Sequence, residues 1–150
     1  MRIILGSDQR GSELRQTLAE RLAQAGHAVM EIGGGDDSDA NDYPTVASQA
    51  ARRVANREAD RGILICGAGI GMCIVANKFR GIRAAPCHNA VTAELSRKHN
   101  DANILCLSSD MLGVEACIAM VGHWLATNFE GGRHGLRIEK IKQIETLAIG

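Results

Sequence analysis

The stretch that most constrains how this chain can fold runs from residue 63 to residue 71 and reads ILICGAGIG. Its unbroken apolar start is typical of a strand that is buried on both faces of a parallel sheet. The glycines at alternate positions after it allow a turn in which a ligand can approach the backbone, and a helical pattern follows. Cys66 is therefore expected at the carboxyl end of a strand, where open α/β sheets bind their ligands.

The glycine turn itself has two interpretations. The free N–H groups and the positive dipole end of the following helix would favour an anion, but similar turns also serve as purely structural connections. The turn lacks the Lys-Ser/Thr pair of a Walker loop, and Met72 stands where a dinucleotide-binding fingerprint has its third glycine. Cys66 is likewise either a small buried apolar residue or a reactive group. This motif alone leaves both alternatives open.

The segments on either side of the turn predict the fold class. Strand patterns at residues 2–6 and 28–32 enclose a helical pattern at 12–25, an arrangement that predicts parallel strands with a right-handed crossover. The alternation continues, and we predict a single α/β domain over residues 1–150, a three-layer Rossmann-like fold with a five-stranded, mostly parallel sheet flanked by helices. The remaining patterns predict strands at 83–86 and 102–107, and helices at 44–57, 72–78, 88–99 (with Val91 and Leu95 facing inward), 113–126 and 131–147.

Composition narrows the class of partner and the compartment. The chain has 17 basic and 17 acidic residues, so its zero net charge gives no indication of a nucleic-acid or membrane partner. Its five cysteines are odd in number and include no Cys-x-x-Cys pair, which favours free thiols and a cytoplasmic protein. The cysteines and histidines also lack the paired spacing of zinc ligands, so we expect no metal site.

Polar residues in two loops that follow strands are further candidates. Asp8, after the first strand, either caps the following helix or faces the ligand crevice as a carboxylate. Tyr43 follows a polar loop, where it is either a packing residue or a group whose hydroxyl meets a ligand. The residues do not distinguish between these roles.

Two basic segments later in the chain have similar alternatives. Arg97 and Lys98 are explained as a solvated helix end that complements the helix dipole, although His99 and Asn100 fit that explanation less well. Arg133 and Arg137, four residues apart, share one face of the last helix. They form either a solvent-facing pair or a strong phosphate-binding pair.

Taken together, these segments resemble the type B ribose-5-phosphate isomerase and galactose-6-phosphate isomerase family along essentially the whole chain. The resemblance implies an aldose–ketose isomerase of a small sugar phosphate, such as ribose 5-phosphate or a related pentose, tetrose or hexose phosphate. It also implies ring opening and C1–C2 proton transfer through a cis-enediolate with no cofactor, in a homodimer or tetramer whose sites are shared between subunits. The motifs that carry it are GSD at 6–8, DYP at 42–44, ICGAGIG at 65–71, ANKF at 76–79, GIRA at 81–84, LSRKHNDAN at 95–103 and FEGGRH at 129–134 with Arg137.

The resemblance also implies a role for each matching residue. Cys66 is the proton-transferring base, because Val75 stands where a second type of these enzymes has a glutamate base. A thiol must lose its proton to act, and the neighbouring helix N-terminus is expected to lower its pKa. His99 matches the acid–base group that opens the ring. The resemblance places Gln9, Asn100 and Asp8 at substrate-binding positions, and Asp8 also among the catalytic groups. Tyr43 matches a pocket wall, and Arg133 and Arg137 match the phosphate-binding groups. An oxyanion hole is implied at the backbone N–H groups of Gly67, Ala68, Gly69, Ile70 and Gly71.

Three residues depart from the family pattern. Gln9 replaces a histidine that helps to hold the phosphate, Ala68 replaces a threonine or serine, and Asp110 replaces an arginine. We therefore hypothesise that the isomerisation chemistry is retained on a shifted substrate, which is another sugar phosphate or an unphosphorylated sugar. A non-catalytic sugar-phosphate-binding subunit of a hetero-oligomeric isomerase is the alternative, and a flavodoxin-like nucleotide or flavin binder is a third reading.

Overall fold

Five short segments pair into one sheet in the computed structural model, which describes residues 1–36 and 38–148. The strand order is β2-β1-β3-β5-β4, and each neighbouring pair is parallel. The predicted fold class is confirmed, and the sheet is wholly rather than mostly parallel within the described residues. The strands are β1 (Arg2–Ser7), β2 (Ala28–Gly33), β3 (Arg61–Cys66), β4 (Ala84–Pro86) and β5 (Ile104–Ser108).

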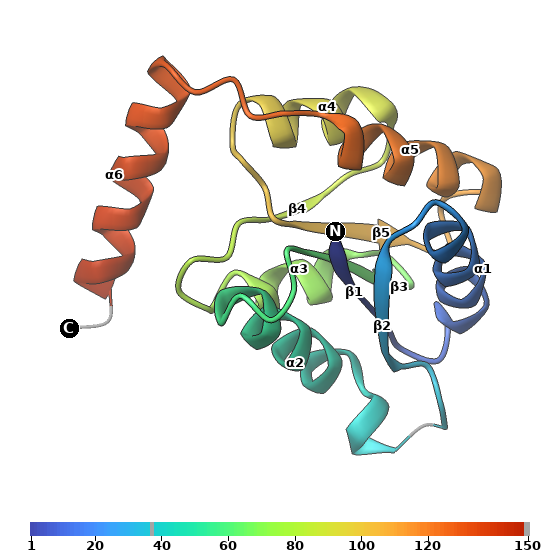
Figure 1. The fold of residues 1–150 in the computed structure, drawn as a ribbon. Helices are drawn as coiled ribbons and strands as arrows, with labels where there is room; N and C mark the ends of the chain where they lie inside the picture. Colours follow the sequence, from blue (N-terminus) through green and yellow to red (C-terminus); the bar gives the residue numbers. More distant parts are fainter. Residues whose placement is uncertain (37, 149–150) are drawn as a thin grey trace.

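Helices cover both faces of this sheet (Figure 1). Helices α1, α4 and α5 pack on one face, and α2 and α3 pack on the other. A right-handed crossover connection of this kind is the usual way to join parallel strands. The helices are α1 (Ser12–Gln24), α2 (Tyr43–Ala55), α3 (Ile70–Ala76), α4 (Ala90–Lys98), α5 (Val114–Ala126) and α6 (Arg133–Ala148), with a 3-10 turn, η1 (Asp39–Asn41), before α2.

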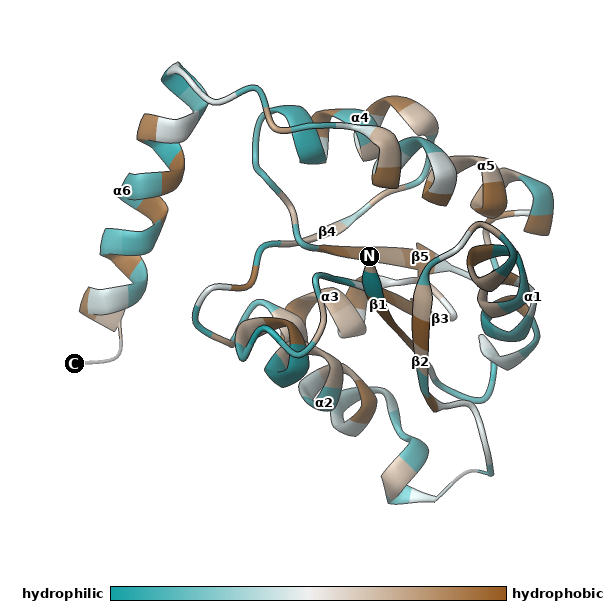
Figure 2. Ribbon diagram, in the orientation of Figure 1, coloured by the Kyte–Doolittle hydropathy of each residue, from teal (hydrophilic) through white to brown (hydrophobic). Residues whose placement is uncertain are grey.

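The strand side chains alternate between two apolar clusters, as the pleat of a strand requires. Ile63 and Ile65 point into the cluster beneath α1, α4 and α5, whereas Leu64 and Cys66 point into the cluster beneath α2 and α3. Because both faces are covered, the central strands are apolar over most of their length, although β1 and β3 each begin with an arginine; Figure 2 shows the hydrophilic start of β1. The side chain of Cys66 therefore lies on the face of the sheet that α2 and α3 cover.

The inward face of α4 differs from the prediction. Val91 is 64% exposed and Leu95 is 40% exposed, so neither lies on the buried side. The residues that face inward are Ala93, Ser96 and Arg97. Small side chains let this helix lie close to its neighbours, and the Ser96 hydroxyl accepts a hydrogen bond from the buried Trp124 indole at 3.1 Å.

Arg97 is also not part of a solvated helix end, because it is only 4% exposed. Its guanidinium donates to Oδ1 of Asp101 at 2.8 Å, to the carbonyl of Ala102 at 2.7 Å and to the carbonyl of Thr127 at 3.3 Å. These bonds join the end of α4, the start of β5 and the connection that follows α5. Lys98 behaves as predicted for a residue in contact with solvent, since it forms a partly exposed ion pair with Glu94.

Helix α6 projects away from the rest of the domain (Figure 1). Only His134 and Ile138 on this helix are buried, whereas the apolar side chains of Leu136, Ile144 and Leu147 are 63–80% exposed. A cavity of about 520 Å³ separates α6 from the edge of the sheet at β4. None of the helices within the described residues is long and apolar enough to span a bilayer.

Candidate active site

The glycine turn after β3 holds the Cys66 thiol in a defined position. Cys66 is the last residue of β3 and is 6% exposed, and the backbone N–H of Gly69 donates to its Sγ at 3.2 Å. Gly69 has a φ of 78°, a left-handed conformation that suits glycine and aims its N–H back at the sulfur.

The turn is also fixed by the segment that follows β5. The Ser108 hydroxyl donates to the carbonyl of Gly67, and the Asp110 N–H donates to the same carbonyl at 3.1 Å. The Ser109 N–H donates to the carbonyl of Cys66 at 3.0 Å. Because β3 and β5 are neighbours in register, the two strand ends hold the turn rigidly between them.

Tyr43 lies against the far end of the turn. A methyl group added to Gly71 would lie 2.6 Å from Cε2 of the Tyr43 ring, so the absence of a side chain at Gly71 makes room for this ring. Tyr43 begins α2, where the Asp42 carboxylate accepts a hydrogen bond from its N–H at 2.9 Å. It is 39% exposed, so one part of the ring packs on the turn while another part faces outward. This geometry fits a wall of a pocket.

Asp8 lies in the loop before α1, where it closes a turn and lines a cavity without capping the helix. Its Oδ1 accepts a hydrogen bond from the Gly11 N–H at 3.0 Å, just before α1, and the residue also lines a cavity of about 240 Å³ with Gln9 and Arg10. The other wall of this cavity is formed by Ser38, Asp39, Asn41 and Asp42. Burial raises the pKa of the Asp8 carboxyl, against the opposing effect of its backbone hydrogen bonds. The cavity opens at the same edge of the sheet as Cys66, because β1 and β3 are parallel neighbours.

An ion pair lies above the turn. Nη2 of Arg10 is 2.9 Å from Oδ2 of Asp110, and a methyl group on Gly67 would lie 3.0 Å from that same oxygen. Arg10 therefore directs its charge at Asp110. The two charges largely neutralise one another beside the candidate site.

His99 and Asn100 lie at the opposite edge of the sheet. Cys66 is in register with Ser108 at the end of β5, whereas His99 and Asn100 precede that strand, which begins at Ile104. The stretch from Ile104 to Ser108 alone spans roughly 13 Å at about 3.3 Å per residue. Within one chain, the structure therefore does not bring His99 to Cys66.

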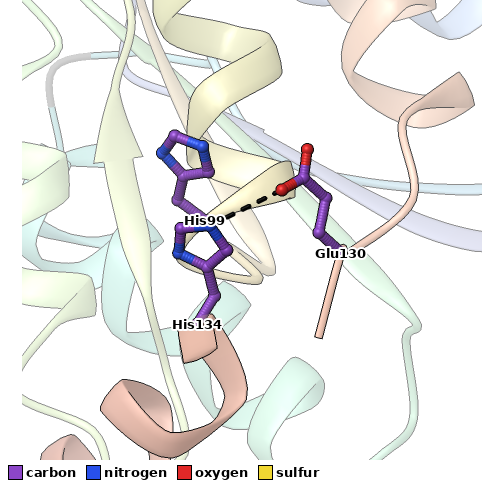
Figure 3. Close-up of side chains that lie close together, drawn as sticks. All are labelled: His99, Glu130 and His134. Carbon is purple, nitrogen blue, oxygen red and sulfur yellow. Dashed lines mark ion pairs between the residues drawn. The ribbon is translucent and has the colours of Figure 1, made fainter. Parts of the chain in front are cut away.

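A second group of side chains gathers around His99 (Figure 3). The rings of His99 and His134 stack with their centroids 4.2 Å apart and an angle of 12° between their planes. The Glu130 carboxylate lies 3.5 Å from Nε2 of His134. Burial lowers the pKa of His134, and the nearby His99 and Arg133 lower it further, against the opposing effect of the Glu130 carboxylate.

The remaining candidates are at this same edge. The Asn100 carbonyl accepts a hydrogen bond from Nε of Arg83 at 3.0 Å. Arg133 and Arg137 are both exposed on α6, and neither forms an ion pair with a residue that the structure describes. The candidates thus divide into Asp8, Gln9, Tyr43, Cys66, Gly67, Ala68, Gly69, Ile70 and Gly71 at the carboxyl edge, and His99, Asn100, Arg133 and Arg137 at the amino edge or on α6.

The fold and the carboxyl-edge site define a class of protein, a doubly wound α/β enzyme with a cysteine held against a glycine turn. A family model described as Ribose/Galactose Isomerase matches residues 3–141, and the chain belongs to this family. It is 44% identical over 144 residues to the ribose-5-phosphate isomerase B of Escherichia coli strain K12, an alignment that covers 96% of each chain.

Two further comparisons bear on the substrate. The D-erythrulose-4-phosphate isomerase of Pectobacterium atrosepticum is 39% identical over 143 residues, with 95% of this chain and 94% of that protein covered. The crystal structure of Mycoplasma genitalium ribose-5-phosphate isomerase B with bound ribulose-5-phosphate matches with a TM-score of 0.90 at 40% identity, over 97% of this chain and 96% of that one. Relatives of this chain thus include isomerases named for a pentose phosphate and for a tetrose phosphate.

Sequence reasoning missed two features of the site region. Glu130 lies in the FEGGRH motif but was assigned no role, because it meets His134 and His99 only after the connection following α5 returns to the end of α4. The pairing of Arg10 with Asp110 was also missed, although the departure at Asp110 had marked that position. The available clue was that both charged residues follow parallel strands on either side of β3, whose ends meet at one edge of the sheet.

Proposed function

We propose that this chain is an aldose–ketose isomerase acting on a small sugar phosphate, with Cys66 as the base. The observation that carries the proposal is the Cys66 thiol held 3.2 Å from the Gly69 N–H at the carboxyl edge of the sheet. Membership of the Ribose/Galactose Isomerase family supports the reaction class.

In this proposal the Cys66 thiolate removes a proton from one of the two carbons, C1 or C2, and returns it to the other, while the hydroxyl proton passes between the oxygens on C1 and C2. The intermediate is a cis-enediolate, and its negative oxygen would be stabilised by the N–H groups of the turn other than that of Gly69, which is directed at Cys66. Tyr43 closes one side of the pocket and the Asp8 carboxylate binds a hydroxyl group. A proton transfer of this kind needs no metal and no organic cofactor.

Ring opening requires a second acid–base group, and we assign it to His99. The ring oxygen, C1 and C2 of a sugar are bonded neighbours, so both acid–base groups must lie within hydrogen-bond reach of adjacent atoms. Cys66 and His99 of one chain are more than roughly 13 Å apart along β5, which makes a site built from a single chain incompatible with this chemistry.

We therefore propose a homo-oligomer, either a dimer or a tetramer, in which each site combines two chains. One chain supplies Cys66 and its turn, and the other supplies His99 and Asn100. Arg133 and Arg137 of that second chain hold the phosphate, which suits two exposed guanidinium groups without ion-pair partners among the described residues. The exposed apolar side chains of α6 support such an association.

The choice of substrate depends on the region around the ion pair between Arg10 and Asp110. With Arg10 directed at Asp110, the turn presents little net positive charge to a phosphate. We propose that the substrate is ribose 5-phosphate with ribulose 5-phosphate, or a related pentose, tetrose or hexose phosphate whose phosphate depends on the two arginines of α6. Such metabolites, together with five free cysteines, fit a cytoplasmic enzyme.

The test is a panel of aldose and ketose phosphates and their free sugars, followed by NMR for exchange of the C2 proton with deuterated water. Exchange by the wild type that falls at least about 100-fold in Cys66→Ala supports the proposal. The matched control is Cys117→Ala, a buried cysteine of α5 remote from the turn, which should retain exchange. Unchanged exchange in Cys66→Ala would refute the role of the base, and binding without any exchange would favour a non-catalytic subunit.

The shared site has its own test by mixing two inactive variants, Cys66→Ala and His99→Asn. If the sites combine two chains, a randomly mixed dimer regains about one quarter of the wild-type activity, because half of the dimers are mixed and each has one intact site. If each site lies within one chain, mixing restores no activity.

A further inference from the structure

The group formed by His99, Glu130 and His134 offers three metal-binding atoms at one point (Figure 3). One ligand atom from each residue lies within 4.8 Å of the other two. The arrangement is set by backbone structure, because the Glu130 N–H donates to the carbonyl of Lys98 at 3.1 Å and ties the connection before α6 to the end of α4. His134, in the first turn of α6, is 5% exposed.

The distances suit a small transition-metal ion. Two ligands bound to zinc at 2.0–2.2 Å with tetrahedral angles lie about 3.4 Å from one another. Oε2 of Glu130 is already 3.5 Å from Nε2 of His134. The His99 ring brings a third ligand atom within 4.8 Å of the other two. Because the lone pairs of stacked imidazoles lie in nearly parallel planes, one ring must rotate out of the stack before both can bind the same ion. The Glu130 side chain, which is 49% exposed, has room to adjust.

The chemistry of the donors selects the class of ion. Two imidazoles and one carboxylate are ligands that zinc, cobalt and nickel prefer, whereas magnesium and calcium prefer oxygen ligands. Three protein ligands also leave a fourth position for water, as in open zinc sites. The one ion pair that Glu130 forms with the described residues is to His134, so its negative charge remains available to offset that of the ion.

We propose that His99, Glu130 and His134 form a binding site for a divalent transition-metal ion such as zinc, and that the bound ion inhibits the enzyme. The inhibitory part rests on the proposed function, since an ion on the His99 ring withdraws the lone pair that ring opening requires. The binding part stands on the geometry of the three side chains alone.

The test uses metal-stripped full-length protein titrated with zinc chloride against a chromophoric zinc chelator, without sugar phosphate. We expect about one zinc ion per chain, and a loss of affinity of at least about tenfold in both His134→Gln and Glu130→Gln. Glu130→Gln keeps the size of a half-exposed side chain and so reports on binding even if the buried His134 variant folds poorly. The matched control is His88→Gln, an exposed histidine outside the group, which should bind zinc like the wild type.

Equal affinity in the wild type and in Glu130→Gln would overturn the proposal. So would an intense thiolate-to-metal band on loading with cobalt, because that band would place the ion on a cysteine. If zinc binds but isomerisation proceeds at an unchanged rate, the inhibitory part is refuted. If the metal-free protein isomerises no sugar phosphate, the proposed function fails while the measured zinc affinity still decides the binding part.

Discussion

Gly69→Ala is the sharpest perturbation of the candidate site, because it changes one backbone position without touching a reactive side chain. Gly69 has a φ of 78°, where an L-residue costs about 1–2 kcal/mol. The added methyl would also lie 3.1 Å from the carbonyl carbon and oxygen of Leu107, so the turn must shift. We expect the free energy of unfolding to fall by somewhat more than the backbone strain alone.

The shift should reduce activity more than stability. The Gly69 N–H donates to Sγ of Cys66 at 3.2 Å, and a hydrogen bond to a charged group contributes about 1.5–3 kcal/mol. If this bond is needed when Cys66 acts as a thiolate, its loss lowers kcat roughly 10- to 100-fold. Isomerase kinetics with the sugar phosphate identified by NMR, together with urea unfolding at one fixed protein concentration, measure both effects.

Gly81→Ala is the matched control for this experiment. Gly81 has a φ of 82°, and a methyl there would meet no described atom within 4 Å. It should therefore carry a similar backbone strain outside the site, with kcat unchanged. Equal losses of kcat in the two variants would refute the argument that the Gly69 N–H supports the Cys66 thiolate.

Three further substitutions test other parts of the structure. Burial raises the pKa of Asp8 above its ordinary value of 3.8, so ionisation of this carboxyl destabilises the folded chain. As the pH rises above 3.8, the free energy of unfolding of the wild type should therefore fall relative to that of Asp8→Asn. Urea unfolding across the acidic range measures this difference. Arg97→Met should cost about 2–4 kcal/mol in the same assay at neutral pH, because it leaves the partners of a 4% exposed guanidinium unpaired. Asp110→Asn releases Arg10 and should lower KM for a phosphorylated substrate a few-fold relative to its free sugar, with little change in stability because the pair is exposed.

Each of these has a result that contradicts it. A difference between wild type and Asp8→Asn that stays constant from pH 3 to pH 7 would show that Asp8 ionises as freely in the folded chain as in the unfolded one. Arg97→Met should destabilise the protein more than Lys98→Met, its exposed neighbour, and an equal effect would refute the buried network. Unchanged KM values in Asp110→Asn would show that the ion pair between Arg10 and Asp110 does not affect which substrate is bound.

The fold class could be predicted because it depends on patterns that are local in the sequence. Continuous apolar runs mark strands covered on both faces, and their alternation with helical patterns implies parallel pairing. The inward face of α4 was predicted wrongly for a related reason. Apolar character pointed to Val91 and Leu95, whereas close packing selected Ala93 and a hydrogen bond to Trp124 selected Ser96. Local hydrophobicity does not report how near a neighbouring helix lies.

The carboxyl-edge half of the site was predictable for a topological reason. Parallel strands end at one edge, so residues after β1 and β3 had to come together there. The burial of Arg97 and the meeting of His99 with Glu130 depend instead on the connection between α5 and α6, which returns to the end of α4. No pattern in the sequence specifies that return, because its bonds run through backbone carbonyl and N–H groups that every residue carries.

The division of the candidate residues between two edges of the sheet and the position of α6 both favour the proposed oligomer, in which each site combines two chains. Helix α6 has 16 residues and is about 24 Å long, yet its buried contacts are limited to His134 and Ile138 in its first half. Its exposed apolar side chains lie on the same element as Arg133 and Arg137, which form no ion pair with the described residues. In the proposed oligomer, a neighbouring chain that covered these apolar side chains would also receive the two arginines. A contact that buried Ile144 and Leu147 without bringing Arg133 near a Cys66 turn would stabilise an oligomer but leave its sites incomplete. For that reason, recovery of activity on mixing inactive variants is a stricter test of this architecture than a measurement of oligomer size.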